Sequence, residues 1–276
     1  MKRLLNFSTL AVWLISCSSN KNKSNSDIGE ISKDANSSTV KMLSYNLMNE
    51  FPHDTLSFTE GLFISDGKLF ESTGSPEDSP NTRSLFGITS LVNGKIKVGA
   101  EIDKKKYFGE GTTILNGKLY QLTYKNKLGF IYDTKVFSRL GTFKYKNSEG
   151  WGLTNDSINL IMSDGTNKIT FLNPKSFSIV KEISVTENNL PVDNINELEY
   201  VNGFIFANLF TTNFILKIDA VTGKVVQKAD LTYLFQKAQA KYPGSQEMNG
   251  IAYNPVSRRF YVTGKMWPYV FEIAFL

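Results

Sequence analysis

The chain has 276 residues, a single cysteine, a single histidine and a net charge of +5 at neutral pH. With only Cys17 available, disulfides, thiolate metal sites and a cysteine nucleophile in the folded part are excluded. With only His53 available, a zinc site of two or three histidines is excluded, and a Ser-His-Asp triad would have to use this residue. Any catalysis must therefore use carboxylates, lysine, tyrosine or amides. The basic residues are scattered apart from residues 104–106, which argues against nucleic-acid binding.

Residues 1–16 are predicted to form a lipoprotein signal peptide. Lys2 and Arg3 precede an apolar run over residues 4–15, which is too short to span a bilayer. The run ends in Leu-Ile-Ser-Cys, which resembles a bacterial lipobox, where the cysteine is lipidated and becomes the first residue of the mature protein. The alternative is a plain signal peptide in which Cys17 is incidental.

Residues 17–40 are rich in Ser, Asn, Lys and Asp, so we expect the lipidated Cys17 to be followed by a flexible tether. The folded part then covers residues 41–276. We expect a monomeric cell-envelope lipoprotein that meets the membrane only through its lipid anchor, on the periplasmic or surface side. Ser18 follows the cysteine in place of the aspartate associated with inner-membrane retention, which favours the outer membrane.

The folded part contains five similar units, and each opens on a short motif built around a Gly or Leu. The steps between these motifs are about 40–50 residues, which is typical of propeller blades. The five motifs are Thr59-Glu60-Gly61-Leu62, Gly109-Glu110-Gly111-Thr112, Gly150-Trp151-Gly152-Leu153, Asn196-Glu197-Leu198-Glu199 and Asn249-Gly250-Ile251-Ala252.

Short segments rich in aromatic and β-branched residues follow the motifs, as expected for strands. Asp66-Gly67, Asn116-Gly117 and Asn202-Gly203 stand between such segments, and these dipeptides favour tight hairpins. Four antiparallel strands in each unit make one blade. The sequence therefore predicts an all-β fold, a five-bladed β-propeller over residues 41–276.

One segment has helical spacing instead. Apolar residues recur three and four apart over residues 230–242, Asp230 is placed to cap the start, and Pro243-Gly244 ends the pattern. We expect a short helix inserted before the last blade. His53 lies in a Pro-His-Asp turn before the first blade, and we expect it on the surface.

In a propeller the inner strands surround a central channel, so the opening motifs of the five units are brought together at its mouth. Polar residues there either bind a ligand or only satisfy one another around a wet channel.

These segments together resemble the glutaminyl-peptide cyclotransferases of the plant and bacterial type. Members of that family are five-bladed propellers that convert an N-terminal glutamine into pyroglutamate and release ammonia. The resemblance covers residues 45–276. The strings that carry it are Phe58-Thr-Glu-Gly-Leu62, Tyr107-Phe-Gly-Glu-Gly111, Gly129-Phe-Ile-Tyr-Asp133, Gly150-Trp-Gly-Leu153, Ser163-Asp-Gly-Thr166, Asn196-Glu-Leu-Glu-Tyr200, Asn249-Gly-Ile-Ala252 and Thr263-Gly-Lys-Met-Trp-Pro268.

The resemblance implies catalytic roles for Glu110, as general acid/base, and for Lys265 and Asn196 as polar groups of the pocket. It implies substrate-binding roles for the residues that complete the pocket. These are Glu60, Trp151, Tyr124, Phe210 and Asn249. Glu60 departs from the family pattern, which usually has glutamine there, and Tyr124 and Phe210 stand where tryptophan is usual.

The expected reaction uses peptides or proteins with an N-terminal glutamine, whose α-amine attacks its own γ-carboxamide. Glu110 would move a proton from the amine to the departing nitrogen. Lys265 and the amides of Asn196 or Asn249 would meet either the carboxamide oxygen or the first peptide carbonyl. Lys265 could instead be a structural partner of Glu197 or Glu199.

This scheme requires no metal and no cofactor. Asp164 and Asp219 could bind calcium, but no spaced run of oxygen ligands accompanies them. Two other functions stay open. One is a calcium-dependent propeller hydrolase of the lactonase kind, and the other is a non-catalytic binding propeller, for which Glu60 is the best argument.

Overall fold

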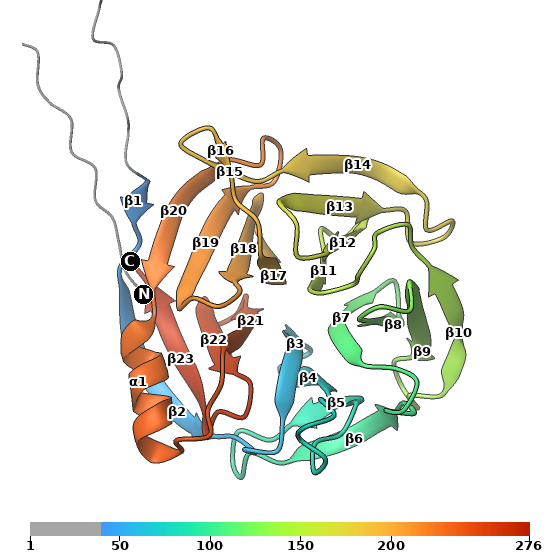
Figure 1. Ribbon diagram of the computed structural model, residues 1–276, viewed down its shortest axis with the longest axis horizontal. Helices are drawn as coiled ribbons and strands as arrows, with labels where there is room; N and C mark the ends of the chain where they lie inside the picture. Colours follow the sequence, from blue (N-terminus) through green and yellow to red (C-terminus); the bar gives the residue numbers. More distant parts are fainter. Residues whose placement is uncertain (1–39) are drawn as a thin grey trace, which may run out of the picture. The chain divides into compact units, whose positions relative to one another are not determined.

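The computed structural model describes residues 40–276, and they form the predicted β-propeller of five blades around a central channel (Figure 1). The predicted signal peptide, Cys17 and the tether up to residue 39 lie outside the described residues. In the described part of the chain no helix is long and apolar enough to cross a bilayer.

Four of the blades follow the chain in order, each from its inner to its outer strand. The first contains β3 (Phe58–Ser65), β4 (Lys68–Gly74), β5 (Leu85–Thr89) and β6 (Ile96–Glu101). The second contains β7 (Gly109–Leu115), β8 (Lys118–Thr123), β9 (Leu128–Asp133) and β10 (Arg139–Lys144). The third contains β11 (Leu153–Asn155), β12 (Leu160–Ser163), β13 (Lys168–Leu172) and β14 (Ile179–Ser184). The fourth contains β17 (Ile195–Val201), β18 (Phe204–Leu209), β19 (Phe214–Asp219) and β20 (Val225–Asp230), with β1 (Lys41–Met42) added in parallel. A small hairpin of β15 (Thr186–Glu187) and β16 (Leu190–Pro191) precedes the fourth blade.

The fifth blade joins the two ends of the described chain. It contains β21 (Met248–Asn254), β22 (Arg259–Gly264) and β23 (Tyr269–Phe275), and its outer strand is β2 (Tyr45–Pro52). β2 runs antiparallel to β23, with Tyr45 opposite Phe275 and Pro52 opposite Tyr269. The ring is therefore closed by hydrogen bonds between strands from opposite ends of the sequence.

The predicted hairpin turns have the expected conformation. Asn116 and Gly117, for example, have φ values of 52° and 70° and connect β7 to β8. Positive φ at both central residues is what a type I′ turn requires, and this turn matches the twist of the two strands it joins.

The glycines of the opening motifs let the inner strands approach one another closely. A Cβ atom at Gly61 would press against the backbone of Gly111 and Thr112 in the next blade, and one at Gly111 would collide with Gly152 and Leu153. Because β3, β7, β11, β17 and β21 therefore lie side by side around the channel, the residues that flank these glycines meet at its mouth (Figure 1).

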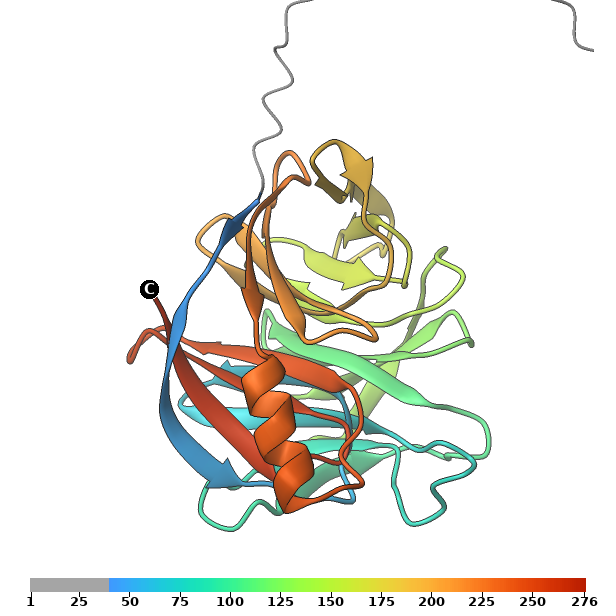
Figure 2. The ribbon, with the colours of Figure 1, turned by 60° about the vertical axis from the view of Figure 1, so that its left-hand side comes forward.

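The inserted helix α1 is Thr232–Lys241 and lies against the fifth blade, beside β2 and β23 (Figure 2). The expected N-cap is wrong by one residue: Leu231 occupies the cap position, and no side chain caps the helix. Asp230 instead accepts a hydrogen bond from the Thr232 N–H through Oδ1, at 2.9 Å. Leu234 and Ala238 face inward and join an apolar cluster between the fourth and fifth blades.

His53 is buried, so the expectation of a surface position is wrong. Its Nδ1 atom lies 2.8 Å from the Trp267 carbonyl oxygen, and its Nε2 lies 3.0 Å from the Glu71 carboxylate. Thr59 and Thr89 also donate hydroxyl hydrogen bonds to Glu71. Burial alone would lower the pKa of His53, but the Glu71 carboxylate raises it above its usual range. The turn that holds His53 is covered by the connection between β22 and β23, which contains Trp267.

Candidate active site

A cavity of about 250 Å³ lies at the mouth of the channel where the inner strands begin. It lies beside the opening motifs because the inner strands all start at this end. Of the site residues predicted in the folded part, all but Asn249 line it. The lining residues are Phe58, Glu60, Pro76, Phe108, Glu110, Tyr124, Trp151, Asn196, Phe210 and Lys265.

Two carboxyl groups line this cavity, and Glu110, on β7, is the one with fewer polar contacts. It is 5% exposed, and no hydrogen bond to its carboxylate is found among residues 40–276. Burial raises the pKa of Glu110 well above its usual range, and the nearby Glu60 carboxylate raises it further, while Lys265 lowers it. A carboxyl group with these properties can hold a proton at neutral pH and exchange it with a bound molecule.

Glu60, on β3, is buried and paired. Its Oε1 atom lies 3.0 Å from Nζ of Lys265, and its Oε2 atom accepts a hydrogen bond of 2.8 Å from Nδ2 of Asn249. Burial raises the pKa of Glu60 to about 7, although Lys265 and Asn249 both act to lower it. Two carboxyl groups and one lysine thus share the cavity. The lysine compensates the charge of one carboxylate, and the other carboxyl group is favoured in its protonated form.

Lys265 reaches the cavity from the connection between β22 and β23. Its backbone is held against the segment before β21: the N–H donates to the Glu247 carbonyl, and the carbonyl accepts from the Gln246 N–H, both at 2.9 Å. The ammonium group lies 4.7 Å from the ring centre of Phe58 and 5.1 Å from that of Phe210. Its carboxylate partner is Glu60, so pairing with Glu197 or Glu199, the alternative raised above, does not occur.

The two predicted asparagines lie at different depths. Asn196 lines the cavity, and its buried Oδ1 atom has no hydrogen-bond partner among the described residues. Asn249 lies behind Glu60 and outside the lining, where its Nδ2 also donates to the Thr59 carbonyl at 3.1 Å. Asn249 is therefore placed to hold the Glu60 carboxylate, and Asn196 is placed to accept a hydrogen bond from a bound molecule.

Aromatic side chains form the wall of the cavity. The rings of Trp151 and Phe210 meet edge to face with centres 5.4 Å apart, and Phe108 lies 6.0 Å from both Phe58 and Tyr124. These rings keep water from the carboxyl groups, which explains why burial dominates their pKa values.

Trp151 is fixed from two sides. Its Nε1 donates a hydrogen bond of 2.9 Å to Glu149, and its ring packs on Gly165, where a side chain would collide with the indole. Gly165 also has a φ of 80°, which suits glycine. The glycine of the Ser163-Asp-Gly-Thr166 string is thus explained by the packing of Trp151.

Three lining residues, Phe58, Pro76 and Phe108, were not predicted as site residues. Phe108 stands two positions before Glu110. Phe58 stands two positions before Glu60 on the same strand, and the alternation of side chains along a strand could have placed both on one face. Pro76 follows β4 in a loop, and no sequence pattern connects it to the channel. Within residues 40–276, no three His, Cys, Asp or Glu side chains are grouped as a metal site would require.

The chain is similar to known proteins in both sequence and fold. A family model described as glutamine cyclotransferase matches residues 10–275. The chain is 34% identical over 231 residues to a glutaminyl-peptide cyclotransferase of Arabidopsis thaliana, covering 81% of this chain and 69% of that protein. The crystal structure of Myxococcus xanthus glutaminyl cyclase is similar with a TM-score of 0.77 and 33% identity, over 86% of this chain and 98% of that one. A sequence match over nearly the whole chain and a common propeller thus agree, and the chain belongs to the glutamine cyclotransferase family of enzymes.

Proposed function

We propose that this enzyme converts the N-terminal glutamine of peptides or proteins into pyroglutamate and releases ammonia. The observation that carries the proposal is Glu110, a buried carboxyl group with a raised pKa, free of hydrogen bonds within the described residues and enclosed by aromatic rings. The names of the Arabidopsis and Myxococcus relatives support the same activity.

The reaction needs little more than positioning and one proton transfer. The α-amine nitrogen forms a bond to the γ-carbonyl carbon, and the bond from that carbon to the carboxamide nitrogen breaks. The amine nitrogen gives up one proton, and the departing nitrogen gains one and leaves as ammonia. One carboxyl group beside both nitrogens can transfer that proton, and Glu110 is the group proposed for it.

The lining residues supply complementary groups for the rest of the substrate. Oxygen charge develops on the carboxamide as the amine attacks, and the Lys265 ammonium is the cation in the cavity that can meet it. Asn196 offers a buried oxygen without a partner, which suits an N–H of the substrate. Trp151, Tyr124 and Phe210 enclose the glutamine methylenes.

The proposal is tested by ammonia release from a peptide that begins with glutamine. The matched control is the same peptide with an acetylated amine, which cannot attack and should release none. Activity is expected to be unchanged in chelator, because the scheme uses no metal. Activity that is lost in chelator and restored by zinc or calcium contradicts the metal-independent mechanism. Peptide binding without ammonia release would support a non-catalytic binding protein instead.

We also propose that Cys17 is lipidated and anchors the enzyme as a monomer in the cell envelope, on the periplasmic or surface side of the outer membrane. The support is the lipobox-like Leu-Ile-Ser-Cys string and the polar composition of residues 17–40. An anchored enzyme would act on peptides that reach the envelope.

A further inference from the structure

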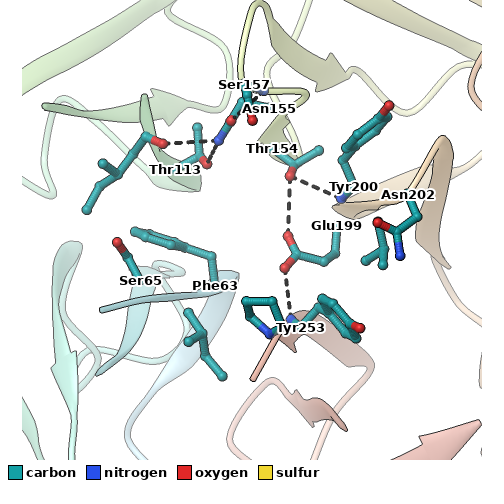
Figure 3. Close-up of a pocket in the computed structure, with 14 residues that line it drawn as sticks. Phe63, Ser65, Thr113, Thr154, Asn155, Ser157, Glu199, Tyr200, Asn202 and Tyr253 are labelled. Atoms are coloured by element: carbon teal, nitrogen blue, oxygen red, sulfur yellow. Dashed lines mark hydrogen bonds between the residues drawn. The ribbon is translucent and has the colours of Figure 1, made fainter. Parts of the chain in front are cut away.

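A second and larger cavity, of about 400 Å³, lies at the opposite mouth of the channel (Figure 3). It is formed where the five inner strands end. One lining residue from each inner strand marks the place: Ser65, Ile114, Asn155, Val201 and Tyr253. The proposed reaction does not use this cavity.

The channel is closed between the two cavities. Glu197 is fully buried there and spans to two other inner strands, since its carboxylate accepts hydrogen bonds from the Leu62 N–H at 3.3 Å and the Ile251 N–H at 2.7 Å. A third inner segment also packs on this residue, since a Cβ atom at Gly152 would collide with the Glu197 Cα. The second cavity is therefore a separate site.

Glu199 lies at the centre of this site, two residues beyond Glu197 on β17. Figure 3 shows its carboxylate between the third and fifth blades, where Oε1 accepts a hydrogen bond from the Tyr253 N–H at 2.8 Å and Oε2 accepts one from the Thr154 hydroxyl at 3.3 Å. The side chain is the sole charged one among the lining residues. No lysine or arginine of residues 40–276 forms an ion pair with it.

A buried carboxylate without a cation is costly, and buried charges in proteins are normally paired. Burial raises the pKa of Glu199 to about 8, although Tyr253 and Thr154 act to lower it. At the other mouth, the charge of the buried Glu60 carboxylate is compensated by Lys265. At this mouth the space beside the carboxyl group is an open cavity, so a bound cation can take the place of a lysine, and the carboxyl proton then leaves to solvent.

We propose that this cavity binds a primary alkylammonium group, with Glu199 as its counter-ion. The other polar groups that line it are neutral hydroxyls and amides, such as those of Thr113, Asn155 and Asn202. One carboxylate with neutral oxygens matches a single positive charge with several N–H donors, whereas calcium binds several oxygen ligands and often more than one carboxylate. The rings of Phe63 and Tyr253 provide apolar surface for the methylenes. Free amines and lysine side chains share this chemistry.

The test is calorimetric titration of the full chain with n-butylammonium chloride. Butanol has the same alkyl chain without the charge, and tetramethylammonium has the charge without N–H donors. The first ligand is expected to bind and the other two to bind at least about tenfold more weakly, because hydrogen bonds to charged groups are worth about 1.5–3 kcal/mol. Binding of butanol as tight as that of butylammonium would overturn the proposal, as would no binding of butylammonium.

Two variants locate the binding site. Glu199→Gln keeps the shape and should weaken butylammonium binding by about tenfold or more while ammonia release continues. The matched control is Glu272→Gln, which removes a buried carboxyl group that contacts Asn49 and Tyr261 outside the cavity, and it should bind as the wild type does. Equal affinity in Glu199→Gln and the wild type would overturn the proposal.

A further variant covers the case in which Glu199→Gln does not fold. Ser65→Tyr places a ring at the partly exposed rim, and it should also weaken binding, whereas unchanged affinity would count against the site. A lysine with blocked main-chain ends separates the two sources of the ligand. Tighter binding of this probe than of butylammonium indicates a lysine side chain of a peptide, and weaker binding indicates a free amine.

Discussion

The Nζ atom of Lys265 lies 3.0 Å from the Oε1 atom of Glu60, and both side chains are buried. Lys265 is the only cationic residue that lines the candidate active site, so this pair leaves no unpaired cation among the lining residues. Glu110 stands in the same cavity without an ion-pair partner among residues 40–276. The two carboxyl groups therefore have different tasks: one compensates the lysine, and the other can exchange a proton.

The pair predicts how Glu60 affects specificity. Glu60→Gln removes the charge that compensates Lys265 and should retain or improve turnover of glutamine peptides. The released ammonium should then attract a carboxylate, so a peptide that begins with glutamate should inhibit the variant about tenfold or more better than the wild type. Inhibition constants measure this, and a norvaline peptide of similar shape but no charge is the control. The same inhibition of both enzymes by the glutamate peptide would contradict the assigned pairing.

Glu110→Gln should fold normally and lose about 10²–10⁴-fold in kcat, which is typical when a general acid/base is removed. Glutamine keeps the size and can form hydrogen bonds but cannot carry the proton. Ammonia release measures the loss, and circular dichroism verifies the fold. An inactive Glu60→Gln beside a nearly normal Glu110→Gln would show that the roles are reversed. Equal impairment of both would indicate that the pair shares the proton.

Stability should fall as pH rises through the neutral range. Burial raises the pKa of Glu199 to about 8 from an ordinary value of 4.5. Between these values the folded protein holds a proton that the unfolded chain has released, so the free energy of unfolding decreases with pH, and the contribution is lost as pH rises to about 8. The raised pKa of Glu60 acts in the same direction. Thermal unfolding between about pH 5 and 9 should therefore show a shallower decline for Glu199→Gln than for the wild type. If stability falls equally with pH in the two proteins, the decline does not come from Glu199.

His53→Ala should destabilise the fold by about 3–5 kcal/mol, because it leaves the Glu71 carboxylate buried without its partner. Denaturant unfolding measures the change. The neighbouring Asp54→Asn is a matched control, since it breaks a pair with the exposed Lys95 and should cost about 1 kcal/mol or less. A His53→Ala cost within about 0.5 kcal/mol of zero would support a surface position after all.

Cys17→Ser should leave the protein unlipidated, while a fragment beginning near residue 40 should stay folded and active. The reason is that the strands and the cavity described above all lie within residues 40–276. Mass spectrometry of the purified chain and ammonia release by the fragment are the measurements. An insoluble fragment beside a soluble mature chain would place the domain boundary earlier.

The features that were predictable from the sequence are those with local patterns. The five opening motifs predicted the number of blades, and Asn116-Gly117 predicted a turn whose φ values the structure shows. Glu110 and Trp151 were placed in one pocket through motifs that the chain shares with its family, and both line the cavity.

The features that were missed depend on residues far apart in the chain. His53 was expected on the surface because a Pro-His-Asp turn is usually exposed, and nothing near it indicates that Glu71 and Trp267 enclose it. Likewise, no local pattern connects Glu60 to Lys265. The alternative that paired the lysine with Glu197 or Glu199 is wrong, although its predicted place in the pocket is confirmed. These side chains meet only when the five blades close into a ring, so the spacing of residues along the sequence does not predict their pairing.

The pairing of β2 with β23 makes the order of folding depend on the completeness of the chain. β2 emerges among the first strands of the propeller, yet its partner is the last strand to appear. Until then β2 is an open strand edge, which is a template for aggregation. A product that stops before residue 269 could form four blades but would keep that edge exposed. Complete chains therefore cover the edge of β2 when the ring closes, and truncated chains leave it exposed. A protease or chaperone could recognise truncated chains by this exposed strand.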